Sequence, residues 1–422
     1  MTEISAEWVL PVAGPPIRDG LVRWEDSRIA EVRPGRAERH FDQAAIVPGF
    51  VNAHSHLEYA NYAGFGDGQP FGPWIRTHVE RKERLSREEM LAIARLGVVD
   101  SLRSGVTTTA DYAFDGVAAV AAHDLGLRAV VHLEVFAADP ADARRQWEEK
   151  RARVTDTHLV TIGVSPHAPY TCSLETYRWC LSLGVPVGTH LAESANEVEW
   201  LARGTGPLQH IAPFLVPPTG RTPVRSLEPV LGPDLLCAHC VEVAPEEVAL
   251  LADRDVPVAH CPRSNALLGC GIAPLALMRD AGVRVGLGTD SPASTPSFDL
   301  FEEMRAAIVL ARARDHSAQA LTAEGALRLA TAEAARTLRM DGEVGTLAPG
   351  KRADLAVVSL AGSPYHPVED PAAAVVFGGS PDRVLETVVD GRTRYRREDE
   401  EQWREVRSTA SAARRTMLAP QR

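Results

Sequence analysis

The hydrophobic positions of this chain fall into short apolar runs that alternate with longer amphipathic stretches. Eight runs have the length of a buried strand and cover residues 47–56, 106–111, 128–136, 159–164, 185–190, 235–241, 256–260 and 283–290. Helical spacing follows each run, at residues 87–102, 116–123, 141–153, 174–183, 196–202, 245–252, 273–281 and 298–313. Eight strand–helix units in series predict an α/β fold, a (β/α)8 TIM-like barrel, although periodicity alone also allows a doubly wound open sheet.

The two ends of the chain have a different pattern. Residues 1–46 and 346–396 contain short β-like pieces separated by glycine and proline. Neither segment has enough apolar residues to fold easily alone, so we expect them to pair into one small β-sandwich domain. The catalytic barrel would then span residues 47–345, and the charged segment 397–422 would form a C-terminal helical tail.

Composition narrows the class of protein. The formal charge is −11, which gives no electrostatic footprint for nucleic acid or an anionic membrane. The first residues lack the features of a signal peptide, and no apolar run approaches the ~20 residues of a membrane helix. Six cysteines are too few for a disulfide framework. We expect a cytoplasmic enzyme with a small-molecule substrate and no nucleic-acid or membrane partner; a homodimer remains open.

Residues of metal-ligand type stand at the ends of these predicted strands. His54 and His56 close the first run and, two positions apart, point to the same face. His190 closes the fifth run and Asp290 the eighth. A lone histidine at a strand end is more often structural, but strand ends of a barrel surround one mouth, so the four residues can converge. Three imidazoles and one carboxylate suit one Zn²⁺, with Fe²⁺ as the next candidate.

These strand ends also carry a family resemblance. The segment Val47-Pro48-Gly49-Phe50-Val51-Asn52-Ala53-His54-Ser55-His56, with His190-Leu191-Ala192-Glu193, His239 and Gly288-Thr289-Asp290-Ser291, resembles the amidohydrolase superfamily and, within it, the mononuclear aminohydrolase branch. The resemblance implies a metal-dependent hydrolase that releases ammonia through attack of metal-bound hydroxide on a cyclic amidine. Binuclear members carry a lysine at the end of the fourth strand, and residues 163–170 contain none. We therefore expect one metal ion.

The resemblance implies catalytic roles for three residues. Glu193 would move protons between the water and a ring nitrogen of the substrate. His239 would hydrogen-bond the attacking water or the developing charge, and Asp290 would hold the metal and steer a proton. A helix N-cap is the alternative for Glu193, and a structural histidine is the alternative for His239.

Four further residues are candidates for substrate contacts. His167 lies in Ser165-Pro166-His167-Ala168-Pro169, which resembles the family's fourth-strand element, although a histidine between prolines could simply order the loop. Glu197 follows Glu193 at a helix start, where acids favour the macrodipole in any case. Trp74 on an aromatic, glycine-rich loop could stack on a purine, and Glu80 could bind ribose hydroxyls. Loop packing and a solvated helix face are the alternatives.

The identity of the substrate is the most specific prediction from the sequence. Residues 204–225 and Pro73-Trp74-Ile75 resemble family members that deaminate 6-aminodeoxyfutalosine in the futalosine route to menaquinone. S-adenosylhomocysteine, methylthioadenosine and adenosine are the alternatives, followed by guanine, a pterin or the dechlorination of a triazine. We therefore expect a purine nucleoside-like substrate or a related heterocycle.

The sequence allows two other interpretations. A metal- and ligand-binding barrel without turnover is a different class of function, but the intact set of candidate catalytic residues argues against it. Zinc deaminases of another fold use His-x-Glu followed by Pro-Cys-x-x-Cys. His132-Leu133-Glu134 matches the first half, but Cys237 follows Leu236 and lies far downstream. That match is at chance level.

Overall fold

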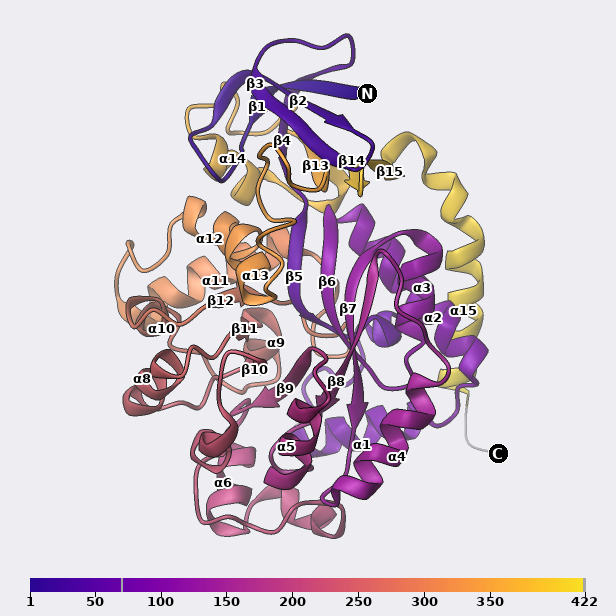
Figure 1. Cartoon of the computed structure of the whole chain (residues 1–422), viewed down its shortest axis with the longest axis vertical. Helices are drawn as coiled ribbons and strands as arrows, with labels where there is room; N and C mark the ends of the chain where they lie inside the picture. The colour runs from indigo at the N-terminus through magenta and orange to yellow at the C-terminus, as the bar shows by residue number, and fades with distance from the viewer. Residues whose placement is uncertain (70, 420–422) are drawn as a thin grey trace.

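The computed structural model describes residues 1–69 and 71–419, and its central feature is a barrel of eight parallel strands (Figure 1). The barrel strands are β5 (Phe50–Ser55), β6 (Val106–Ala113), β7 (Arg128–Val135), β8 (Val160–Pro166), β9 (Val187–Leu191), β10 (Leu235–His239), β11 (Val258–His260) and β12 (Val285–Leu287). They pair in chain order, each with the next. The predicted barrel is confirmed, and the open doubly wound sheet is excluded by the closure between the first and last strands.

Barrel closure joins β5 to the segment around β12. The backbone N–H of Asp290 donates to the carbonyl of His54 over 3.0 Å, and Ser55 and Asp290 form a parallel bridge. The Asn52 side chain reinforces this joint, since its amide donates to Thr289 Oγ1 over 2.8 Å and its oxygen accepts from the Thr289 N–H over 3.0 Å. The two ends of the barrel sequence are therefore fixed side by side at the level of the predicted ligands.

Helices surround the barrel and seal its outer face. Those following the barrel strands are α2 (Arg87–Arg103), α3 (Val117–Leu125), α4 (Pro140–Arg151), α5 (Leu174–Ser182), α6 (Ala195–Arg203), α8 (Pro245–Asp253), α10 (Leu275–Asp280) and α11 (Leu300–Asp315). Shorter or later helices are η1 (Leu57–Tyr62), α1 (Phe71–Lys82), α7 (Pro223–Leu227), α9 (Pro262–Leu267), α12 (Ala323–Leu329) and α13 (Ala332–Thr337). The alternating apolar positions of the strands pack against the apolar stripes of these helices in one large core.

Both ends of the chain contribute to a second sheet, which lies at the top of Figure 1. Its order is β15 (Arg392–Arg396), β14 (Val384–Val389), β13 (Leu355–Ser359), β4 (His40–Pro48), β1 (Thr2–Val9), β2 (Ile17–Glu25) and β3 (Arg28–Pro34). The prediction of a small domain from both ends is confirmed. Its form differs, because the strands pair edge to edge into one continuous seven-stranded sheet, whereas a sandwich was expected.

The sheet meets the barrel at the amino ends of the barrel strands, opposite the predicted metal ligands. β4 continues to Pro48, so the apolar run 47–56 is divided between the two sheets. Arg128 at the start of β7 donates to both carboxylate oxygens of Asp354, over 2.9 and 3.1 Å, and both charged groups are buried. Helix α14 (Pro371–Gly378) interrupts the C-terminal strands and was not predicted.

The tail forms helix α15 (Arg404–Leu418), which runs along α2 at the edge of the barrel (Figure 1). Its Arg414 donates to the carbonyls of Asn61 and Ala63, and the Asn61 side chain donates back to the carbonyl of Ala410. Met417 is fully buried among aromatic residues of the η1–α1 segment. The C-terminal helix therefore holds the segment that follows the two-histidine strand. Of the helices described, none has the length and apolarity needed to cross a membrane.

Candidate metal centre and active site

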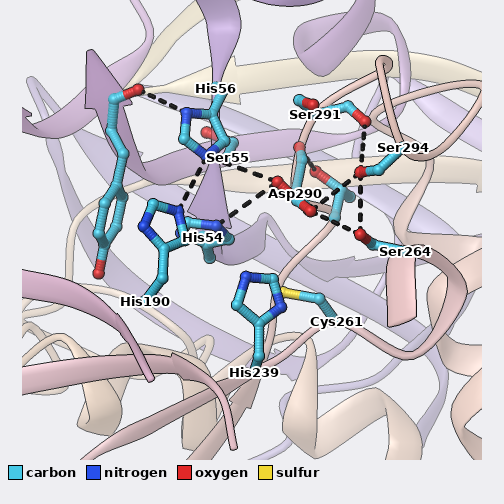
Figure 2. Close-up of polar contacts among 12 residues, drawn as sticks. His54, Ser55, His56, His190, His239, Cys261, Ser264, Asp290, Ser291 and Ser294 are labelled. Carbon is cyan, nitrogen blue, oxygen red and sulfur yellow. Dashed lines mark hydrogen bonds and ion pairs between the residues drawn. The ribbon is translucent and has the colours of Figure 1, made fainter. Parts of the chain in front are cut away.

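The predicted ligands converge at the carboxyl ends of the barrel strands (Figure 2). His54 lies on β5, His56 directly after it, His190 on β9, and Asp290 beyond β12. Asp290 Oδ1 lies 3.6 Å from His54 Nε2 and 3.5 Å from His56 Nε2, and the Nε2 atoms of His56 and His190 are 3.3 Å apart. A tetrahedral metal with ligand bonds of 2.0–2.2 Å separates its ligand atoms by roughly 3.3–3.6 Å. The cluster therefore has the dimensions of a metal site.

The hydrogen bonds of the histidines support the same conclusion. The carbonyls of Tyr112 and His167 accept from Nδ1 of His56 and His190, over 2.8 and 2.9 Å. A carbonyl can only accept, so Nδ1 carries the hydrogen and Nε2 presents its lone pair to the centre. Both ring nitrogens of the fully buried His54 lack a hydrogen bond to any residue that the structure describes. A buried imidazole without a partner is costly, and a metal ion at this centre removes that cost.

The protonation states also suit metal binding. Burial lowers the pKa of His54 to about 3 and that of His190 well below its usual value. Burial alone would raise the pKa of Asp290, but the His54 imidazole, whose Nε2 lies 3.6 Å from Oδ1, holds it well below the usual range. The hydroxyls of Ser264 and Ser294 donate to Asp290 Oδ2 over 2.5 and 2.9 Å, which leaves Oδ1 facing the histidines. Neutral imidazoles and an ionised carboxylate are the forms that bind metals.

Glu193 and His239 lie beside the cluster. Glu193 is buried after β9, and its Oε1 is 3.9 Å from His239 Nε2. Burial, followed by the charge of Asp290, raises the pKa of Glu193 to about 8. The Nδ1 of His239 lies 3.0 Å from the side-chain nitrogen of Asn265. If this amide donates to Nδ1, Nε2 carries the hydrogen and His239 is a donor toward Glu193 and the centre.

Three residues of the site have backbone torsions in the left-handed region, which is strained for residues other than glycine. Ala192, His239 and Asp290 have φ values of 51°, 77° and 59°. The left-handed region costs an ordinary residue on the order of 1–2 kcal/mol, and such strain gathers at functional sites. Each of these three residues lies at or just after the end of a barrel strand, where its backbone turns the chain away from the strand direction. The turn directs the adjacent polar side chains toward the cluster.

The structure brings some of the candidate substrate contacts to the site. His167 is half-buried, its ring centroid is 4.9 Å from that of His190, and burial lowers its pKa to about 4. Glu197 is buried beneath the loop that carries Glu193: its carboxylate accepts from the N–H groups of Ala192 and Glu193 over 3.2 and 2.9 Å. Both oxygens of Glu197 are thus engaged in holding this loop, and its substrate contact stays a prediction.

The other two candidates lie on α1. Trp74 is half-buried, stacks on His78 at 5.6 Å, and donates from Nε1 to the carbonyl of Ala293 over 3.1 Å. It therefore fastens α1 to the loop that follows Asp290. Glu80 is exposed on the same helix and belongs to none of the possible metal-binding groups among the described residues. For both, contact with substrate stays a prediction.

Three features of the site were not predicted from the sequence. Ser264 and Ser294 bind Asp290, and nothing in their spacing signals that contact. Glu134 at the end of β7 lies with a carboxylate oxygen within 4.8 Å of ring nitrogens of His167 and His190. The signal for Glu134 was present, because it stands two positions after His132 at a strand end, the same arrangement as His54 and His56.

Fold and site together define a metal-dependent barrel enzyme. The chain belongs to the amidohydrolase family, whose model matches residues 45–394. It is accordingly an amidohydrolase-type hydrolase.

Individual relatives extend over nearly the whole chain. A 5'-deoxyadenosine deaminase of Methanothermobacter thermautotrophicus is 33% identical over 409 residues, covering 92% of both chains. A 5-methylthioadenosine/S-adenosylhomocysteine deaminase of Syntrophobacter fumaroxidans is 35% identical over 397 residues, covering 88% of this chain and 87% of that one. Among solved structures, an adenosine deaminase from Xanthomonas campestris with bound zinc is similar, with a TM-score of 0.84, 26% identity and 98% of each chain covered.

Removing one ligand tests the metal centre. We expect the wild-type protein to bind one equivalent of Zn²⁺ and His56→Ala to bind it at least about tenfold more weakly, because the variant lacks one of four ligands. Titration of metal-free protein with Zn²⁺ measures this. His123→Ala, on the exposed face of α3, is the matched control and should bind like the wild type. Equal affinity of His56→Ala and the wild type would remove His56 from the centre.

Proposed function

We propose that this protein hydrolytically deaminates an adenine nucleoside of the 5'-deoxyadenosine, 5'-methylthioadenosine, S-adenosylhomocysteine or adenosine type. The observation that carries the proposal is the buried set of three histidines and Asp290 with Glu193 and His239 beside it. Two relatives that cover most of the chain bear names of this activity, which supports the substrate class. They favour the alternative substrates over 6-aminodeoxyfutalosine, which was the first expectation from the sequence and is not confirmed.

His54, His56, His190 and Asp290 would hold the metal. We propose Zn²⁺, with support from the zinc in the similar adenosine deaminase structure and from the ligand types; Fe²⁺ remains the alternative. When bound, the metal supplies Lewis acidity and lowers the pKa of a coordinated water.

The remaining chemistry belongs to residues of the chain. A water oxygen forms a bond to the ring carbon that bears the amino group. Glu193 receives a proton of that water and delivers it to the neighbouring ring nitrogen, a transfer suited to a buried carboxyl with a pKa raised to about 8. His239 hydrogen-bonds the charge that develops on oxygen. The carbon–nitrogen bond then breaks, the remaining water proton goes to the departing amine, and ammonia leaves.

The test of this proposal is a substrate panel. We expect ammonia from 5'-deoxyadenosine, 5'-methylthioadenosine, S-adenosylhomocysteine or adenosine in Zn²⁺-replete protein, with a parallel change of the adenine absorbance. Guanine, cytosine and 6-aminodeoxyfutalosine complete the panel, and a chelator should abolish turnover. Release from none of the adenine nucleosides would refute the proposal.

A single substitution tests the proton carrier. Glu193→Gln keeps the shape of the side chain but cannot take up a proton, so we expect kcat to fall by about 10²–10⁴-fold while Zn²⁺ content is unchanged. Glu199→Gln is the matched control, because Glu199 lies on α6, the helix that follows Glu193, and its carboxylate accepts from Thr205 Oγ1 over 2.9 Å. Wild-type kcat in Glu193→Gln would assign the proton transfer to another group.

A further inference from the structure

The end of β7 presents a carboxylate that the chemistry above does not use. Val131, Leu133 and Val135 pack in the core between barrel and helices, so Glu134, in the opposite phase, points into the barrel. Glu134 is only 2% exposed, and its carboxylate makes no hydrogen bond or ion pair with any residue that the structure describes. Its carboxylate oxygens nevertheless keep some exposure to solvent, since they are not among the fully enclosed polar atoms without a partner. A partnerless carboxylate therefore lines the mouth next to His167 and His190.

A second unpaired charge lies nearby on α1. Lys82 is 9% exposed, and its ammonium stands over the ring of Phe114 at 3.4 Å and that of Tyr59 at 5.9 Å. Burial lowers the pKa of Lys82 to about 8, and the charge of Glu134 opposes that shift. Lys150, which donates to the backbone carbonyl of Glu134 over 2.6 Å, stands over the same Phe114 ring at 5.0 Å, and this ring therefore places Lys82 and Glu134 in one neighbourhood. They are nevertheless too far apart for an ion pair within 4 Å. Lys82, too, lacks a hydrogen bond or ion pair to any described residue.

The other charged groups around this position are occupied. Glu58 accepts from the backbone N–H groups of Asp115, Gly116 and Ala118 over 2.9, 2.8 and 3.3 Å. Lys150 donates to the backbone carbonyl of Glu134 over 2.6 Å. One free carboxylate and one free ammonium remain, and their formal charges cancel.

The chemistry of this pair defines its ligand. A buried carboxylate needs a hydrogen-bond donor, and a buried ammonium needs an acceptor. A hydroxyl group is both, whereas a phosphate or carboxylate on the ligand would be repelled by Glu134. The ribose of every nucleoside in the proposed class carries two neighbouring hydroxyls. We infer that Glu134 and Lys82 form the subsite that binds the ribose 2'- and 3'-hydroxyls of the substrate, an inference that rests on the proposed function.

The experiment compares adenosine with 2'-deoxyadenosine and 3'-deoxyadenosine. For the wild type we expect kcat/KM to fall by about 10- to 100-fold when a bound hydroxyl is removed, because hydrogen bonds to charged groups are the stronger ones. In Glu134→Gln the value for adenosine should fall by a similar factor, mainly through KM. The ratio between adenosine and the deoxynucleosides should then approach one, with Zn²⁺ content unchanged.

Two further variants make the outcome decisive. Lys82→Met keeps the apolar stem without the charge and should reduce the same ratio, which covers the case in which Glu134→Gln does not fold. Glu148→Gln, on the exposed side of α4, should keep the wild-type ratio. An unchanged ratio in both site variants, or a wild type that does not discriminate, would overturn the subsite and leave the deaminase proposal standing. A wild type that releases no ammonia from any adenine nucleoside would overturn both.

Discussion

The contact between β5 and the segment after β12 is the constraint on which this site depends. The hydrogen bond from the Asp290 N–H to the His54 carbonyl, with the Asn52–Thr289 pair beside it, closes the barrel. Closure places Asp290, the one carboxylate among the predicted ligands, against the two histidines of the first strand, although they stand at opposite ends of the barrel sequence. His190 enters from the far wall on β9. No short segment of the chain contains all four predicted ligands, so without closure they would not lie together.

Burial then gives the cluster its chemistry. Imidazoles enclosed in the barrel stay neutral, and the Asp290 carboxylate stays ionised because His54 and two serine hydroxyls stabilise it. Burial raises the pKa of the Glu193 carboxyl to about 8, and the charge of Asp290 adds to this shift. One enclosed mouth thus holds the predicted ligands in the protonation states that bind metals, and beside them the Glu193 carboxyl, which we propose as the proton carrier.

The sequence predicted the barrel and the ligands because both leave local signals. Strand runs alternate with helical runs, and His54, His56, His190 and Asp290 each stand at the end of a run. Contacts between distant segments left no such signal. Nothing near Glu197 indicates that its carboxylate would hold the Glu193 loop, and nothing near Lys82 distinguishes it from the exposed Glu80 two residues earlier. The edge-to-edge pairing of the terminal strands likewise depends on β4 accepting both β1 and β13, which strand propensity cannot specify.

We propose that one metal ion, held by four residues from three separate parts of the barrel, makes this protein a deaminase. The most direct test of this proposal is stoichiometric reconstitution: metal-free protein receives increasing Zn²⁺ while ammonia release from 5'-deoxyadenosine or 5'-methylthioadenosine is followed. We predict that the rate rises in proportion to the metal and stops rising at one equivalent per chain. Turnover in the metal-free protein, or a rate that keeps rising up to two equivalents of Zn²⁺, would show that the reaction does not depend on a single metal ion.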